Sequence, residues 1–76
     1  MDINTINKIV KERYNCMVVS IFKYENTNFI KGLESLKNSI RYRYFKIEKD
    51  KIVEILDENI LNYFREKNEI HEDVNY

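Results

Sequence analysis

The chain has 76 residues and a formal net charge of zero, with one cysteine, one histidine and one glycine. This length corresponds to one small domain with a thin core, so a homodimer that buries further apolar surface is one expectation. One cysteine excludes an intramolecular disulfide, and one cysteine with one histidine excludes a zinc-finger site. A lone thiol suits a reducing compartment, and no apolar run approaches the length of a membrane-spanning helix. We therefore expect a cytoplasmic protein without membrane contact.

The charges are segregated along the chain. Residues 31–51 hold seven basic and three acidic side chains, a net charge of +4, whereas residues 52–76 hold two basic and seven acidic side chains, a net charge of −5. Either segment is a candidate for contact with a partner of opposite charge.

The first predicted element is an amphipathic helix from Asp2 to Arg13. Its apolar residues recur three or four positions apart and form one stripe: Ile3, Ile6, Ile9 and Val10. Asp2 is its expected N-cap, and Asn15 tolerates the left-handed conformation that ends helices.

The next segment, Cys16 to Tyr24, is rich in β-branched and aromatic residues. It predicts a central strand that is buried on both faces at its start, with Cys16 as a buried, unreactive thiol. Residues 25–28 form a polar turn.

Phe29 to Ser39 is predicted as a second helix. Phe29, Leu33, Leu36 and Ile40 follow helical spacing. Gly32 would lie inside this helix at a cost of about 1 kcal/mol relative to alanine. It is either a tolerated weakness or the mark of a close approach by another backbone.

Residues 40–48 alternate strictly and predict a strand. One face would carry Arg41, Arg43, Phe45 and Ile47, and the other Ile40, Tyr42, Tyr44 and Lys46. Either face is a candidate core face or binding face.

Two interpretations compete for residues 50–68. In the favoured one, Ile52 to Leu56 returns as a hairpin strand and Asp57 caps a final helix, with Leu56 and Leu61 in a hydrophobic staple. In the other, Asp50 caps one long helix.

These elements predict a small single α+β domain in the order αβαββα, with helices packed on one face of a three-stranded sheet. The compact domain covers residues 1–69, and residues 70–76 are expected to be an acidic, frayed tail.

Patterns for catalysis and metal binding are missing. The one histidine, His71, lies in the tail without a second histidine at ligand spacing. A single glycine excludes a glycine-rich phosphate loop, and a core this small leaves little room for a catalytic pocket. The sequence therefore predicts a protein that is not an enzyme and that uses no cofactor or metal.

The leading hypothesis is a small non-catalytic binding protein that occludes or modulates a macromolecular partner. A protein is the favoured kind of partner. A phage or mobile-element inhibitor of a host protein complex is an example. The alternative is a single-module RNA or single-stranded DNA binder that uses the basic-aromatic strand 41–49, where rings stack on bases and cations meet phosphates. Candidate partner-binding residues come from the two charged segments: Arg41, Tyr42, Arg43, Tyr44, Lys46, Lys49, Glu54, Asp57, Glu58 and Glu66.

Overall fold

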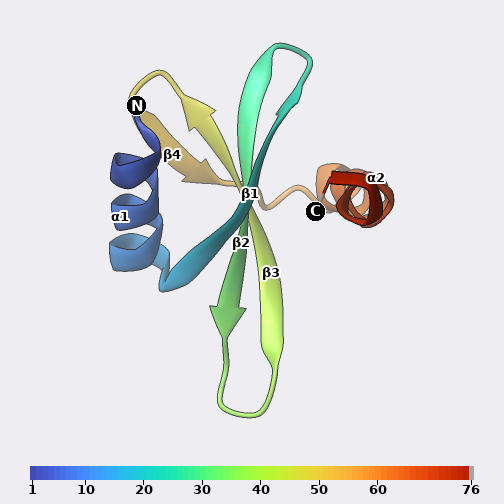
Figure 1. Ribbon diagram of the computed structural model, residues 1–76, viewed down its shortest axis with the longest axis horizontal. Coiled ribbons are helices and arrows are strands. Elements are labelled where there is room, and N and C mark those ends of the chain that lie inside the picture. The colour runs from blue at the N-terminus through green and yellow to red at the C-terminus, as the bar shows by residue number, and fades with distance from the viewer. Residues whose placement is uncertain (76) are drawn as a thin grey trace.

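The computed structural model describes the backbone of residues 1–75 and the side chains of residues 1–67. The elements in chain order are α1 (Ile3–Tyr14), β1 (Cys16–Tyr24), β2 (Thr27–Ser35), β3 (Ile40–Glu48), β4 (Lys51–Glu54) and α2 (Glu58–Asn75). The strands form one antiparallel sheet in the order β1-β2-β3-β4 (Figure 1). The predicted α+β class is confirmed. The predicted tail at 70–76, with His71, lies outside the residues whose side chains are described.

The two helices lie on opposite faces of the sheet (Figure 1). The predicted order αβαββα, with three helices on one face of a three-stranded sheet, was therefore wrong in detail. The reason lies in the two central strands, which carry large apolar residues on both faces. Ile30 and Phe45 pack toward α1, whereas Phe29 and Tyr44 pack toward α2. Each face needs its own helix to exclude water.

The segment predicted as a second helix is strand β2. Glu25 and Asn26 both adopt positive φ, 48° and 62°, in a two-residue turn that brings Thr27 opposite Tyr24. β2 then pairs with β1 on one side and with β3 on the other. This pairing outweighs the helical spacing of the apolar residues, which is a weak local preference.

Gly32 lies inside β2, where neighbouring side chains leave little room for a larger residue. A Cβ atom on Gly32 would lie 3.0 Å from Cε2 of Phe45 and 3.2 Å from Cβ of Cys16. The nearest backbone atom, the Arg43 carbonyl oxygen, would be 3.7 Å away. The sequence interpretation that Gly32 marks a close approach is therefore correct. However, the groups that approach it most closely are side chains, and not the backbone that was predicted.

Strand β1, predicted to be central, is an edge strand with a bulge at Val19. Val18 pairs with Gly32 and Ser20 pairs with Lys31, so Val19 is an extra residue in the strand. Because side chains alternate, a bulge switches the face to which the following residues point. Without the bulge, Cys16 and Phe22 would share one face, because they are an even number of residues apart; with it, Cys16 packs toward α1 and Phe22 toward α2.

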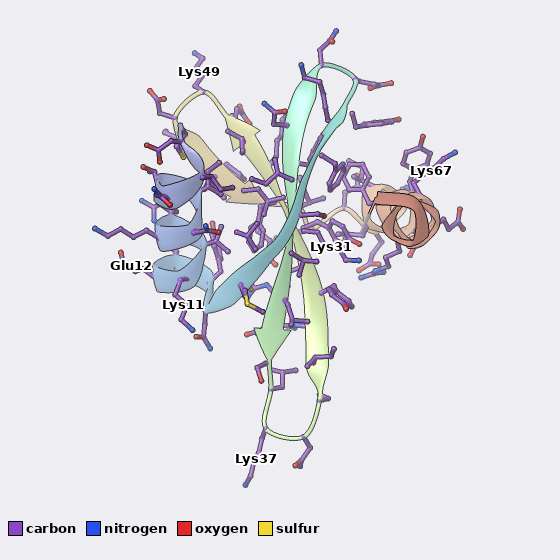
Figure 2. All side chains as sticks on the ribbon, viewed as in Figure 1. Lys11, Glu12, Lys31, Lys37, Lys49 and Lys67 are labelled. Carbon is purple, nitrogen blue, oxygen red and sulfur yellow. The ribbon has the colours of Figure 1, made fainter. Side chains whose placement is uncertain are left out.

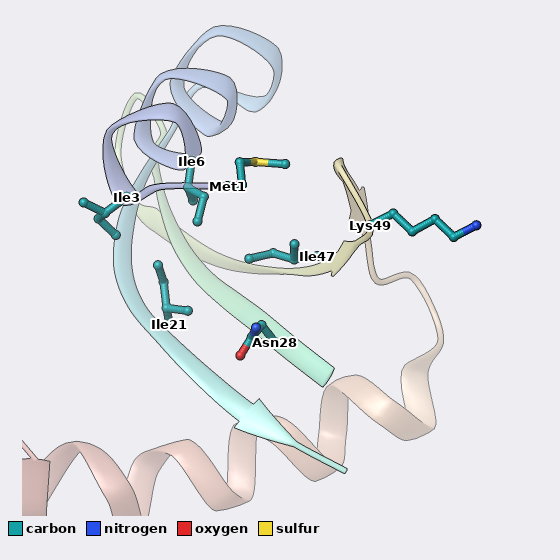
Figure 3. A pocket seen from close by; sticks show the side chains of 7 residues that line it. All are labelled: Met1, Ile3, Ile6, Ile21, Asn28, Ile47 and Lys49. Carbon is teal, nitrogen blue, oxygen red and sulfur yellow. The ribbon is translucent and has the colours of Figure 1, made fainter. Parts of the chain in front are cut away.

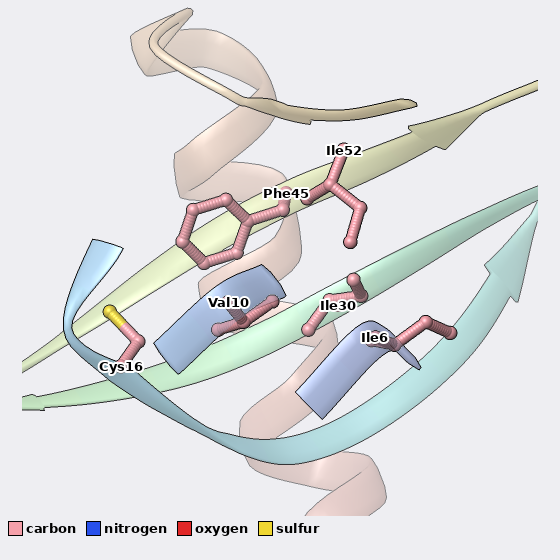
Figure 4. Packing of buried hydrophobic residues seen from close by; sticks show 6 residues of the cluster. All are labelled: Ile6, Val10, Cys16, Ile30, Phe45 and Ile52. Atoms are coloured by element: carbon pink, nitrogen blue, oxygen red, sulfur yellow. The ribbon is translucent and has the colours of Figure 1, made fainter. Parts of the chain in front are cut away.

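Each face of the sheet has its own hydrophobic cluster. The α1 cluster consists of Ile6, Val10, Cys16, Ile30, Phe45 and Ile52 (Figure 4). The α2 cluster is mostly aromatic and consists of Phe29, Tyr44, Leu61 and Phe64, with Phe22, Tyr24 and Ile55 packed against it. The sheet is thus the middle layer of three, although the chain is short.

Both predicted ends of α1 and the predicted start of α2 are confirmed in the structure. The Thr5 amide donates to Oδ1 of Asp2 at 2.8 Å, and Asn15 ends α1 with a φ of 55°. The Asn59 amide donates to Oδ1 of Asp57 at 2.9 Å. The hairpin interpretation of residues 50–68 is therefore correct, and the single long helix is excluded.

The hydrophobic staple predicted before α2 does not form. Leu56 is 75% exposed, whereas Leu61 packs in the α2 cluster beside Ile55. The backbone amide of Ile55 donates to the Tyr44 carbonyl at 2.8 Å, which carries the β3–β4 pairing one residue past β4. This bond places the Ile55 side chain over the sheet, where it packs against the cluster that contains Leu61. The sequence had predicted that contact for Leu56.

Candidate protein-binding surface

Strand β3 holds half of the ten candidate residues, and two of them, Arg43 and Tyr44, are largely removed from solvent. Arg43 is 17% exposed and binds Glu54 at two points, with Nε to Oε2 at 2.7 Å and Nη2 to Oε1 at 2.5 Å. Its Nη1 also donates to the Tyr14 carbonyl at 3.3 Å. The guanidinium and the carboxylate neutralise each other, and these bonds hold α1, β3 and β4 together. Arg43 and Glu54 therefore stabilise the fold and are not available to a partner.

Tyr44 is the second candidate that the structure buries. It is 2% exposed, and its ring lies 5.8 Å from Phe64 and 6.4 Å from Phe22. Its neighbour two positions earlier, Tyr42, is 44% exposed, and the Lys31 ammonium lies 4.2 Å from its ring centroid. Of the two tyrosines in this strand, Tyr42 alone offers its ring to a partner.

The other basic candidates lie apart from one another. Arg41 is exposed and forms a hydrogen bond from Nε to Oε1 of Glu34 at 2.8 Å. Lys46 lies on the opposite face of β3, with its ammonium 3.7 Å from a carboxylate oxygen of Glu48. Lys49 lies in the β3–β4 turn with a φ of 56°.

The acidic candidates of α2 are spread along that helix. Asp57 is the N-cap, and Glu58 in the first turn lies 3.7 Å from Nη1 of Arg65. Glu66 is exposed near the end of the described side chains. The ten candidate residues therefore do not form one surface, and the pair Arg43–Glu54 is the one ion pair among them that the structure describes.

A different surface emerges at the β2–β3 hairpin, which extends beyond both helices (Figure 1). Met17 pairs with Leu33 and Leu33 with Tyr42, so the three side chains form a row across β1, β2 and β3. Ile40 lies on the same face, two residues before Tyr42. We call Met17, Leu33, Ile40 and Tyr42 the hairpin patch. Met17 is 62% exposed and Ile40 57%.

The hairpin patch adjoins the α2 cluster on the same face of the sheet. α2 packs on the row that contains Phe29, and the patch occupies the rows toward the hairpin tip. Leu36 in the connecting loop is 41% exposed, and Lys37 projects from the tip (Figure 2). Of the four patch residues, only Tyr42 was among the ten candidate partner-binding residues. Because residues 29–39 were predicted to form a helix, the sequence did not indicate that Leu33 and Tyr42 are neighbours on adjacent strands.

A second feature is an open hollow on the α1 face, at the opposite end of the strands (Figure 3). Its volume is about 400 Å³. The lining side chains come from α1 and the segment before it, from three strands and from the β3–β4 turn: Met1, Ile3, Ile6, Ile21, Asn28, Ile47 and Lys49. The hollow combines aliphatic walls with one amide and one ammonium group.

Reactive groups are few among the described side chains. Burial raises the pKa of the Cys16 thiol, whose Sγ donates to the Tyr14 carbonyl at 3.3 Å. In the part of the chain that the structure describes, no three His, Cys, Asp or Glu side chains are grouped to hold a metal ion, and no helix could cross a membrane. No family model, curated protein or solved structure matches the chain.

Proposed function

We propose that this chain is a small non-catalytic binding protein that occludes or modulates a protein partner through the hairpin patch. The observation that carries the proposal is the hairpin patch, in which Met17, Ile40 and Tyr42 are exposed, at a hairpin that extends beyond both helices (Figure 1). Contiguous exposed apolar side chains are costly in water and mark sites of protein contact.

The chemistry of the patch indicates the kind of surface it fits. Met17 is flexible, Ile40 is aliphatic, and Tyr42 offers a ring with a polar hydroxyl, a combination that suits an apolar groove with a polar rim. Lys37 projects from the hairpin tip beside the patch and supplies positive charge (Figure 2), whereas Arg41 points to the other face of the sheet and is bound to Glu34. A groove with acidic residues at its rim is the complementary surface.

Site-specific photo-crosslinking in cells of the natural host tests this proposal. A photoreactive phenylalanine analogue replaces Ile40 in one variant and Glu12 in the other, and both positions are exposed. Glu12 lies on α1, far from the hairpin (Figure 2). We expect one defined protein adduct from position 40, resistant to nuclease, and none from position 12. Equal adducts from both positions, or no adduct from position 40, would contradict the proposal.

A matched pair of variants then tests the contact itself. Met17→Thr with Ile40→Thr removes apolar surface but keeps residues suited to strands, so the free energy of unfolding should change by less than about 1 kcal/mol. Capture of the crosslinked protein should fall at least tenfold. Val53→Thr, at a 44% exposed position on β4, is the control and should leave capture unchanged.

A further inference from the structure

The hollow on the α1 face leaves aliphatic surface uncovered around a concave site. Ile3 is 52% exposed, Met1 44% and Ile21 37%, while Ile6 forms part of the floor and is buried. The volume of about 400 Å³ lies within the range of roughly 300–1,000 Å³ that is usual for small-molecule sites. An apolar occupant would remove these side chains from water without displacing any described residue.

Two polar side chains in the lining are available to an occupant. The Asn28 carboxamide and the Lys49 ammonium make no hydrogen bond or ion pair with the residues that the structure describes. Lys49 starts at the rim and extends into solvent (Figure 3), and its four-carbon stem allows the ammonium to turn back over the opening. Lys23 pairs with Asn28 across β1 and β2 and adds a second positive charge on the same face.

Among the residues that line the hollow, the ionised charge has one sign. Lys49 is the one ionised side chain among the lining residues, and none of them is acidic. Asp2 lies between Met1 and Ile3 in the chain, but its carboxylate accepts the Thr5 amide as the cap of α1. An occupant with a negatively charged end is therefore favoured over one with a positive end.

We propose that the hollow binds an alkyl chain that ends in a carboxylate, as in a medium-chain fatty acid. The lining contains no aromatic ring and no arginine, which are the side chains that dominate protein–protein contacts. Unbroken aliphatic walls match a methylene chain, and the amide and ammonium groups match a carboxylate head. This site is separate from the hairpin patch, so it stands or fails independently of the proposed function.

Methyl NMR on the full chain, labelled at isoleucine and methionine, tests the site with decanoate below its micelle concentration. We expect saturable shifts of the methyl groups of Ile3, Ile21 and Ile47, with no shift at Ile40 or Ile60. Decylammonium should bind at least about tenfold more weakly, because its head meets positive charge. No saturable binding, or equal binding of the two probes, would overturn the proposal. So would a preference for an acidic peptide over decanoate.

A pair of charge variants separates the site from general attraction. Lys49→Gln should weaken decanoate binding about fivefold, the effect expected of a half-exposed ion pair. Lys37→Gln makes the same charge change at the hairpin tip, far from the hollow (Figure 2), and should leave the affinity unchanged. An equal loss in both variants would overturn the proposal. Both positions are exposed, so both variants should fold.

Discussion

Arg43 and Glu54 bind each other at two points across β3 and β4, with distances of 2.7 Å and 2.5 Å. The guanidinium carbon also lies 5.5 Å from the ring centroid of Tyr14 and 5.9 Å from that of Phe45. The hydrogen bonds that Arg43 donates to the Glu54 carboxylate raise the pKa of the guanidinium further above its ordinary value, so its charge persists. One basic side chain thus links the end of α1 to two strands.

The first prediction compares the two arginines of this face. Arg43→Ala would leave the Glu54 carboxylate and the Tyr14 carbonyl without this partner in a mostly buried place, so we expect a loss of about 2–4 kcal/mol of unfolding free energy. Arg41→Ala removes an exposed ion pair and should cost less than about 1 kcal/mol. Urea unfolding measures both. Equal urea midpoints for the two variants would show that the Arg43–Glu54 pair stabilises the protein no more than the exposed ion pair of Arg41 does.

The second prediction concerns Gly32. A Cβ at this position would lie 3.0 Å from the Phe45 ring, so Gly32→Ala should destabilise the protein by about 1–3 kcal/mol through overpacking. Phe45→Leu removes the ring, and in that background the same substitution should cost clearly less. A double-mutant cycle by urea unfolding measures the coupling. Additive effects would mean that the ring is not what excludes the side chain.

The third prediction concerns how α2 is held to the sheet. Phe64 is 2% exposed, and its ring centroid lies 4.8 Å from that of Phe29 and 5.2 Å from that of Phe22. Phe64→Ala should cost about 3–5 kcal/mol. The neighbouring Tyr63, which is 38% exposed, is the control, and Tyr63→Ala should cost less than half as much. Thermal unfolding followed by circular dichroism measures both. A similar loss of stability in the two variants would mean that α2 packs on the sheet in a different rotation about its axis.

The fourth prediction uses the Cys16 thiol. Its pKa is raised by burial, so the folded protein keeps its proton at a pH where the unfolded chain releases it. This contribution to stability is complete below the unfolded pKa and is lost as the pH rises above about 9. Wild-type stability should therefore fall more steeply on the alkaline side than that of Cys16→Ala.

A thiol reagent provides a second measurement of the burial of Cys16. It should label native Cys16 slowly and the urea-unfolded chain quickly. Fast native labelling would contradict its burial.

The fifth prediction addresses the nucleic-acid alternative. Arg43 is bound to Glu54 and Tyr44 is buried, so strand 41–49 keeps too few free rings and cations on one face to bind a single strand. We expect no measurable binding of a mixed-sequence oligonucleotide at physiological salt by fluorescence anisotropy. A micromolar or tighter complex that weakens steeply with salt would revive that alternative.

Much of the local structure was predictable because it depends on neighbouring residues. Asp2 and Asp57 cap their helices through amides two or three residues away, and Asn15 ends α1 by its own backbone preference. The strict alternation of residues 40–48 correctly placed Arg43 and Tyr44 on opposite faces. Such features follow from short stretches of sequence, whatever the rest of the chain does.

The sequence by itself therefore determined the α+β class, the starts of α1 and α2 and the buried Cys16, and it favoured the β3–β4 hairpin over one long helix. Tertiary structure alone decided that residues 27–35 form a strand, because that choice depends on hydrogen bonds to β1 and β3, and not on local spacing. It also decided which candidates remain available to a partner. Arg43 and Tyr44 are committed inside the fold, while Met17 and Ile40 are brought together at the surface by a register that periodicity does not encode.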